Sequence, residues 1–151
     1  MSDKQRHAWA IYCDDVRQEV GNKLSFMGIY NGEMYFNEFP STLPKLSIVA
    51  YCQTNIDNLI KDLKCEIYVD DSLAFSYDVM NNMTPPSKEA LVERGTDKDP
   101  IKLIYYTCST QFNNLLFEKP TIIQAIFIAD GITILAGKLR VKAFNTTPTI
   151  Q

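Results

Sequence analysis

The chain has 151 residues, of which 46% are hydrophobic and 22% charged, and its formal net charge is −3. This length and composition are typical of one globular domain. Lys and Arg residues do not cluster, so the surface lacks the basic face that phosphate binding requires. No apolar run approaches the roughly 18 residues of a membrane-spanning helix. We therefore expect one domain over 1–151, with flexible tails at 1–7 and 145–151, and neither nucleic acid nor a membrane as partner.

Apolar and polar residues alternate with a period of two along most of the chain, which predicts about nine strands. The predicted strands span 8–13, 23–30, 33–37, 45–54, 63–70, 73–79, 102–108, 121–129 and 132–143. Tight turns separate several of them at Asn31-Gly32, Asp70-Asp71 and Asp130-Gly131. The first and last of these pairs tolerate the positive φ that a two-residue hairpin turn demands. The pattern predicts an all-β, two-sheet antiparallel sandwich, with a closed barrel as the alternative.

The C-terminal half supplies most of the predicted core. Residues 122–129 are apolar on both faces, which predicts a central strand. Its partner alternates regularly only after Gly137, and a glycine inside a strand often marks a bulge that resets the inward face. Across the chain, the side chains predicted to be buried are Trp9, Ile11, Phe26, Ile48, Ile67, Ile126, Phe127, Leu139 and Val141.

Two connections are longer than the rest. Residues 39–44 carry Pro40 and Pro44, and proline donates no hydrogen bond, so this segment is expected to cross over without pairing. Residues 84–100 are dense in charge and form one long crossover loop, with a short helical turn possible around Leu91. A solvated connection is the expected role of this loop, although long loops also carry functions.

The four cysteines indicate a reducing compartment. Cys13, Cys52 and Cys65 each share a strand face with apolar residues, and no CxxC pair occurs. Such cysteines, Cys108 included, are expected to be free thiols packed as small apolar side chains, with a zinc site from scattered thiols as the alternative. The N-terminal residues are polar and lack an apolar signal core. We therefore expect a cytoplasmic location.

Sequence templates for catalysis are absent. The single histidine, His7, lies in the predicted N-terminal tail, so triad or Cys–His chemistry would depend on a residue outside the predicted core. Glycine-rich phosphate-binding loops do not occur either. The sequence therefore predicts a protein that is not an enzyme and that needs no cofactor.

Four carboxylates offer a candidate metal site. If consecutive strands run antiparallel, Asp14 and Asp15 lie at the same end of the sandwich as Asp70 and Asp71. Calcium takes six to eight oxygen ligands and could bind there. The alternative is that these residues satisfy turn donors and pair with Arg17. Because the DxD-type spacing of calcium loops is missing, no metal ligand is expected.

Three segments carry a resemblance to a known family. They are residues 11–30, which contain Cys13-Asp14-Asp15-Val16-Arg17, then 39–46, and then Ala136-Gly137-Lys138-Leu139-Arg140-Val141. This pattern resembles a family of small uncharacterised bacterial and phage proteins, a domain of unknown function, over nearly the whole chain. The resemblance implies an immunoglobulin-like sandwich of bacterial or phage origin with no assigned activity, and it supplies no catalytic residues. The charged 84–100 segment does not match the family pattern.

The remaining chemistry favours a non-catalytic protein-binding module. Asp15, Arg17 and Glu19 place charges of both signs on one predicted corner, while Tyr30 and Tyr35 flank the Asn31-Gly32 turn as candidate aromatic anchors. Edge strands of a sandwich can also accept a partner strand. The partner is expected to be a host protein or a second copy of the chain. The alternatives are a calcium-binding sandwich and a structural subunit of a larger assembly.

Overall fold

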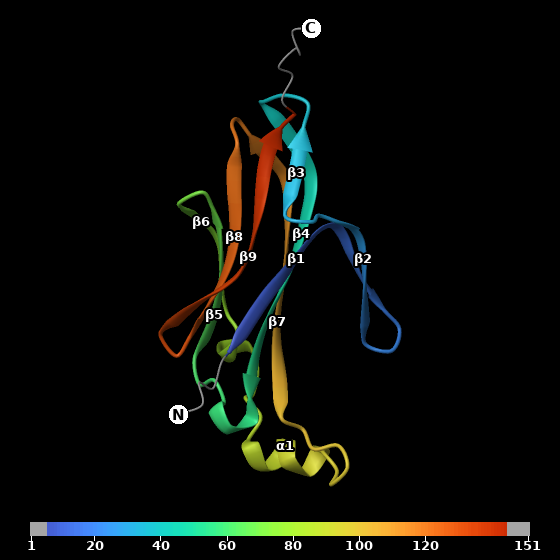
Figure 1. Cartoon of the computed structure of the whole chain (residues 1–151), viewed down its shortest axis with the longest axis vertical. Helices are drawn as coiled ribbons and strands as arrows, with labels where there is room; N and C mark the ends of the chain where they lie inside the picture. The colour runs from blue at the N-terminus through green and yellow to red at the C-terminus, as the bar shows by residue number, and fades with distance from the viewer. Residues whose placement is uncertain (1–5, 145–151) are drawn as a thin grey trace, which may run out of the picture.

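The computed structural model describes residues 6–144, which form two β-sheets packed face to face (Figure 1). Sheet A has the strand order β2-β1-β4-β7, and sheet B has the order β3-β9-β8-β5-β6. The strands are β1 (His7–Glu19), β2 (Lys23–Ile29), β3 (Glu33–Phe36), β4 (Ser41–Asn55), β5 (Leu63–Val69), β6 (Ser72–Asp78), β7 (Leu103–Phe117), β8 (Thr121–Ala129) and β9 (Ile132–Ala143). The predicted all-β sandwich is confirmed, and β8 is the central strand of sheet B.

One strand pairing departs from the antiparallel prediction. β3 runs parallel to β9, with Met34 opposite Val141. The predicted hairpin at Asn31-Gly32 is therefore wrong, because β2 and β3 belong to different sheets. The turn itself is present: Gly32 has φ +87°, and its carbonyl accepts a hydrogen bond of 2.9 Å from the Arg140 N–H. The turn thus carries the chain from sheet A to sheet B.

Three strands of sheet A are longer than predicted. β1 continues to Glu19, β4 begins at Ser41, and β7 reaches Phe117. The prolines do not prevent pairing of β4, since Leu43 pairs with Leu115 and Lys45 with Asn113. The expectation that residues 39–44 stay unpaired is therefore wrong from Ser41 onwards. The missed half of β7 is rich in Ser, Asn and Gln, so it lacks the apolar alternation on which the prediction relied.

The predicted β8–β9 bulge is confirmed. Ala125 pairs with Gly137, but the next residue, Ile126, pairs with Leu135. Ala136 is the extra residue of β9. Ala136 is buried, and beyond it the buried residues are Leu139 and Val141. The buried positions therefore change from even-numbered to odd-numbered residues at the bulge.

The core prediction is correct for five of the nine residues and wrong for the other four, two of which lie at the start of β1. Ile48, Ile67, Phe127, Leu139 and Val141 are buried as predicted. Trp9 is 36% exposed, and Ile11, Phe26 and Ile126 are only half-buried. The inward face of β1 consists of smaller residues and one tyrosine, namely Ala8, Ala10 and Tyr12. Both faces of β1 are apolar, so alternation alone did not identify the inner one.

The long crossover is more ordered than a solvated loop. Residues 88–94 form helix α1 (Lys88–Arg94), and the Ser87 side chain accepts a hydrogen bond from the Ala90 N–H at its start. Leu91 is only 2% exposed, so this helix is anchored by a buried side chain. The 3-10 helices η1 (Ile56–Asn58) and η2 (Met80–Asn82) complete the structure.

The N-terminal tail is shorter than expected. His7 already pairs with Gln53 in β1, and Arg6 forms an ion pair of 2.8 Å with Asp130. The remainder of the two predicted tails, 1–5 and 145–151, lies outside the described residues. Among the described helices, none has the length and apolar character needed to cross a membrane.

Candidate functional site

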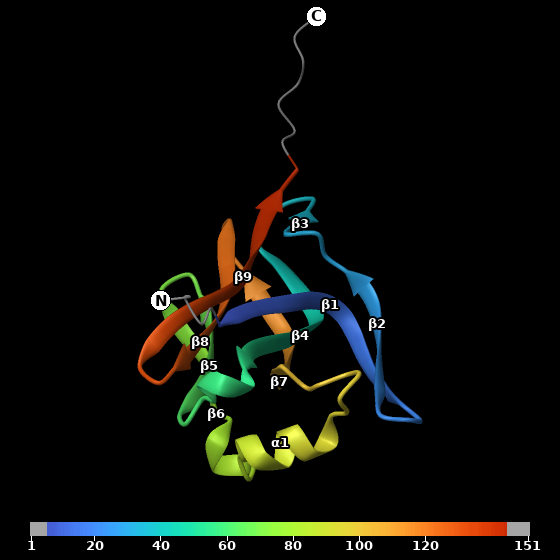
Figure 2. The same ribbon diagram turned by 60° about the horizontal axis from the view of Figure 1, so that its bottom comes forward.

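The β1–β2 hairpin projects from sheet A as a wing, which we define as residues 14–28. β1 pairs with β4 only from His7 to Cys13, and from Cys13 onwards it pairs with β2. The second half of β1 therefore leaves the sheet together with β2, as both views of the molecule show (Figures 1 and 2). The sequence prediction placed a turn at Asp14-Asp15, whereas the turn lies at 20–22.

Three contacts hold the root of this wing. The Tyr30 hydroxyl donates a hydrogen bond of 2.6 Å to Asp14 Oδ1, and Lys45 of β4 forms an ion pair with Asp15. Gly28 has φ +67°, and a Cβ built there would lie 2.1 Å from Asp14 Oδ2. Only glycine combines this backbone conformation with so close an approach.

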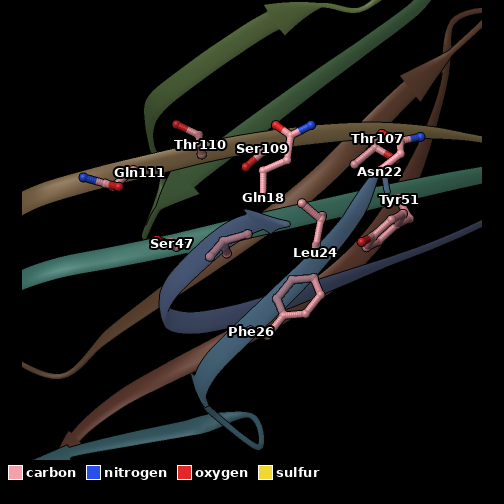
Figure 3. Close-up of a pocket in the computed structure, with 11 residues that line it drawn as sticks. Gln18, Asn22, Leu24, Phe26, Ser47, Tyr51, Thr107, Ser109, Thr110 and Gln111 are labelled. Atoms are coloured by element: carbon pink, nitrogen blue, oxygen red, sulfur yellow. The ribbon is translucent and has the colours of Figure 1, made fainter. Parts of the chain in front are cut away.

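The wing and the outer face of sheet A enclose an open trough of about 800 Å³ (Figure 3). Its lining residues come from both halves of the wing and from the middle of β4 and β7. They are Val16, Gln18, Asn22, Leu24, Phe26, Ser47, Tyr51, Thr107, Ser109, Thr110 and Gln111. This lining contains hydroxyl, amide and apolar groups but no formally charged side chain.

An aromatic cluster continues the trough along the outer face of sheet A. Trp9 stacks on Tyr51 with ring centroids 5.2 Å apart, and Tyr105 meets Trp9 edge to face at 5.8 Å. Tyr51 belongs to both the cluster and the trough lining. Tyr105 is 56% exposed, so a large aromatic surface faces solvent beside the trough.

This surface is electrically neutral, because no formally charged side chain lines the trough. Of the residues in the trough and the cluster, burial raises the pKa of Tyr51, so that its hydroxyl stays protonated at neutral pH. A charged pair lies at the root of the wing, where a hydrogen bond from Lys45 holds the pKa of Asp15 below its usual range. The surface can therefore donate and accept hydrogen bonds and bury apolar groups without moving protons.

The five residues predicted to bind a partner do not form one surface. Asp15 and Arg17 lie on the wing and are 3.4 Å apart in an ion pair, and Glu19 lies opposite Lys23 near its tip. Tyr30 is bound to Asp14 at the wing root. Tyr35 lies in the other sheet, on β3, so the structure does not bring it together with the residues of the wing.

Tyr35 also has local partners of its own. Its hydroxyl donates a hydrogen bond of 2.5 Å to Glu33, which in turn pairs with Lys142. Its ring stacks on Phe144 with centroids 5.1 Å apart. These contacts give Tyr35 a structural role at the β3–β9 edge of sheet B.

The four candidate metal ligands are also separated. Asp14 and Asp15 lie at the wing root, while Asp70 and Asp71 form the β5–β6 turn on the opposite flank of the molecule (Figures 1 and 2). Asp70 Oδ1 accepts a hydrogen bond of 2.9 Å from the Ile122 N–H. The structure therefore does not bring the two pairs of carboxylates together: Asp14 and Asp15 belong to β1 of sheet A, and Asp70 and Asp71 to the β5–β6 turn of sheet B. Residues 6–144 contain no group of three or more His, Cys, Asp or Glu side chains placed to hold a metal ion.

The cysteines follow the prediction of buried free thiols. All four are free and buried, and three of them, Cys52, Cys65 and Cys108, belong to the core between the sheets. Burial raises the pKa of Cys52 to about 11, and a hydrogen bond with Cys108 together with burial raises the pKa of Cys65. Cys13 is buried at the wing root instead, where its Sγ lies 3.4 Å from the Asp15 carbonyl oxygen.

Sequence reasoning missed the trough because it missed two of the elements that build it. The second half of β7 supplies Ser109, Thr110 and Gln111, and the predicted strand ended at 108. The sequence prediction also took the outward face of β1, which carries Trp9, for the inward one. The common face of Trp9, Tyr51 and Tyr105 follows from strand register, because Trp9 pairs with Tyr51 and Tyr105 pairs with Gln53, two residues along β4. No local pattern in the sequence signals that register.

Fold and site together define a class: an all-β, two-sheet protein with a projecting hairpin and a neutral, aromatic-flanked trough on one sheet. Within that class the chain belongs to the family of unknown function DUF6941, whose model matches residues 8–142. The expected relationship to a family of unknown function is thereby confirmed. A search among curated proteins finds no match for the chain.

Proposed function

We propose that this protein is a non-catalytic protein-binding module and that the trough with its aromatic cluster is the binding surface. The observation that carries the proposal is the exposed Trp9–Tyr51–Tyr105 cluster, which is continuous with an uncharged trough of about 800 Å³. We further propose, from the resemblance described above, that it acts in the cytoplasm of a bacterium or during phage infection.

The composition of the surface supports a protein partner. Tyr and Trp are enriched among the residues that dominate binding energy in protein interfaces, and charged residues are depleted at interface centres. Leu24, on the wing, is 38% exposed and faces the trough, and Phe26 lies beside it. A monomeric protein rarely leaves so much aromatic and apolar surface open beside a concave site without a binding role.

The same groups argue against a catalytic role for this site. General acid–base catalysis uses side chains that gain and lose protons near the working pH. The trough offers hydroxyls and amides from residues such as Ser47, Thr107 and Gln111. Such groups recognise a partner through hydrogen bonds, which supports binding as the function.

Affinity capture with a matched pair of variants tests this proposal. Tyr105→Ala removes the exposed ring of the cluster, whereas Tyr77→Ala removes a ring of sheet B that is 37% exposed and stacked on Phe75. We expect partner capture from host lysate, quantified by mass spectrometry, to fall at least tenfold with Tyr105→Ala and to stay unchanged with Tyr77→Ala. Equal capture by both variants, with both folded by circular dichroism, would overturn the assignment of the surface.

A further inference from the structure

We infer that the free edge of β7 pairs with the β7 of a second copy of this chain, in antiparallel orientation, so that sheet A becomes continuous across a twofold axis. β7 is a terminal strand of sheet A, with β4 as its one neighbour in the described sheets. An edge strand directs the N–H and C=O groups of about half its residues outwards, where they can accept another strand. The inference is distinct from the proposed function: it concerns the free backbone edge of β7, whereas the proposed function concerns the side chains on the outer face of sheet A, some of which belong to β7.

The four sheet edges of this molecule differ in how they are protected. Proteins usually block edge pairing with short strands, charged residues or proline. β3 has four residues and contains Glu33, β2 contains Lys23, and β6 contains Asp78. β7 has fifteen residues and contains neither a charged residue nor proline. It is therefore the longest edge and the one without these protective features.

The absence of charge selects a second copy as the occupant. In a twofold antiparallel pairing, the residues near the axis of one strand lie beside the same residues of the other. A charge at or beside the axis would then face the same charge of the other copy, and like charges destabilise cross-strand pairs. A strand of fifteen residues without charge, in a chain whose net charge is −3, meets this condition. An edge that binds a different protein has no such need to be neutral.

The outward side chains of β7 also suit this pairing. Leu103 and Tyr105 are 40% and 56% exposed on the outer face of sheet A, and Leu116 is 58% exposed near the other end of the strand. Ser109, Gln111 and Asn113 between them are neutral and polar. A twofold axis perpendicular to the sheet keeps the outer faces of both copies on the same side. The troughs of the two copies then lie side by side on one extended surface.

Charge substitutions near the middle of β7 test this inference on the purified protein. Ser109 lies opposite Val49 and is exposed, so a long side chain there can be accommodated by the monomer. We expect the wild-type chain to sediment as a dimer of 17.2 kDa protomers at micromolar concentration. Ser109→Lys and Ser109→Glu should each raise the dimer dissociation constant at least tenfold at low salt. An equimolar mixture of the two variants should restore the dimer.

A matched control uses the edge of the other sheet. Ser76 is exposed on β6, and Ser76→Lys should leave the dimer intact. A wild-type chain that stays monomeric up to about 100 µM would overturn the inference and leave the edge to an extended segment of a different protein. Disruption by Ser76→Lys, or failure of the mixed Lys and Glu variants to associate, would also overturn β7 self-pairing. Neither outcome depends on partner capture through Tyr105, so the two proposals fail separately.

Discussion

The hydroxyl of Tyr12, on sheet A, donates a hydrogen bond of 2.9 Å to the carbonyl oxygen of Gly137, on sheet B. The hydroxyl oxygen of Tyr12 in turn accepts a hydrogen bond of 3.1 Å from the Ala125 N–H, on the neighbouring strand of sheet B. Ala125 and Gly137 are the last regular pair before the β8–β9 bulge. One tyrosine therefore satisfies the two backbone groups that lie at the irregularity and connects the two sheets through their core.

Replacing Tyr12 with Phe should destabilise the protein although the ring still fills its place. The change leaves a buried N–H and a buried C=O without their partner, which typically costs about 1–3 kcal/mol. Chemical denaturation should report this loss, and hydrogen exchange should become faster at the Ala125 amide in particular. Tyr77→Phe, on an exposed ring, is the matched control and should change the unfolding free energy little. Unchanged exchange at Ala125 would contradict the role assigned to Tyr12.

Replacing Gly28 with Ala should disturb the root of the wing. The new methyl group would collide with the Asp14 carboxylate, and the backbone has φ +67°. Such strain costs on the order of 1–3 kcal/mol. We expect a lower melting temperature together with new chemical shifts for residues 14–28. Gly131→Ala separates the two causes, because it has φ +82° with open space around the added Cβ. An equal loss in both variants would mean that the contact with Asp14 contributes nothing.

Asp130 should make the stability of the protein depend on pH in the acid range. Although desolvation opposes it, the N–H groups of Asp62 and Lys61 and the Arg6 guanidinium hold the pKa of this carboxyl below its ordinary value. A carboxyl whose pKa is lower in the folded state stabilises the fold above its unfolded value of about 3.9, and this stability is lost as the pH falls through the folded pKa.

The variant Asp130→Asn tests this linkage. Asparagine keeps an acceptor oxygen and tolerates the φ of +49° at this turn position, so the change removes mainly the charge. We expect a loss of about 1 kcal/mol at pH 7 that shrinks towards zero as the pH falls through the lowered pKa of the folded state. Urea denaturation over a pH series measures the difference. A difference that is constant with pH would show that the charge is not involved.

Helix α1 should contribute measurably to stability through Leu91. The sequence analysis predicted a solvated connection over residues 84–100, to which this helix belongs. The side chain of Leu91 is 2% exposed, and large-to-small changes at buried leucines typically cost about 2–5 kcal/mol. We expect Leu91→Ala to lower the unfolding free energy within this range, near its lower end because the helix has seven residues. Val92→Ala, at a position that is 56% exposed, is the control and should have a small effect.

The four thiols should react only when the protein unfolds. Burial removes access to them, and the pKa of Cys52 is raised to about 11, which keeps its thiol protonated at neutral pH. In a labelling experiment with an aromatic disulfide reagent, we expect no rapid reaction in the native state and four equivalents in denaturant. Fast native labelling of two or more cysteines would contradict the described core.

The sequence alone determined those structural elements that depend only on residues close together in the chain. Alternation over two residues located all nine strands, and Asp130-Gly131 and Gly137 identified a hairpin turn and a bulge, because positive φ values and bulges depend on a few neighbouring residues. Tertiary structure decided which apolar face of β1 turns inwards, where Tyr12 is required to reach Gly137 across the core. It also decided that β1 leaves β4 after Cys13, since strand pairing joins residues that are distant in the chain. The trough depends on this departure, and no local pattern within β1 or β2 encodes which strand each will pair with.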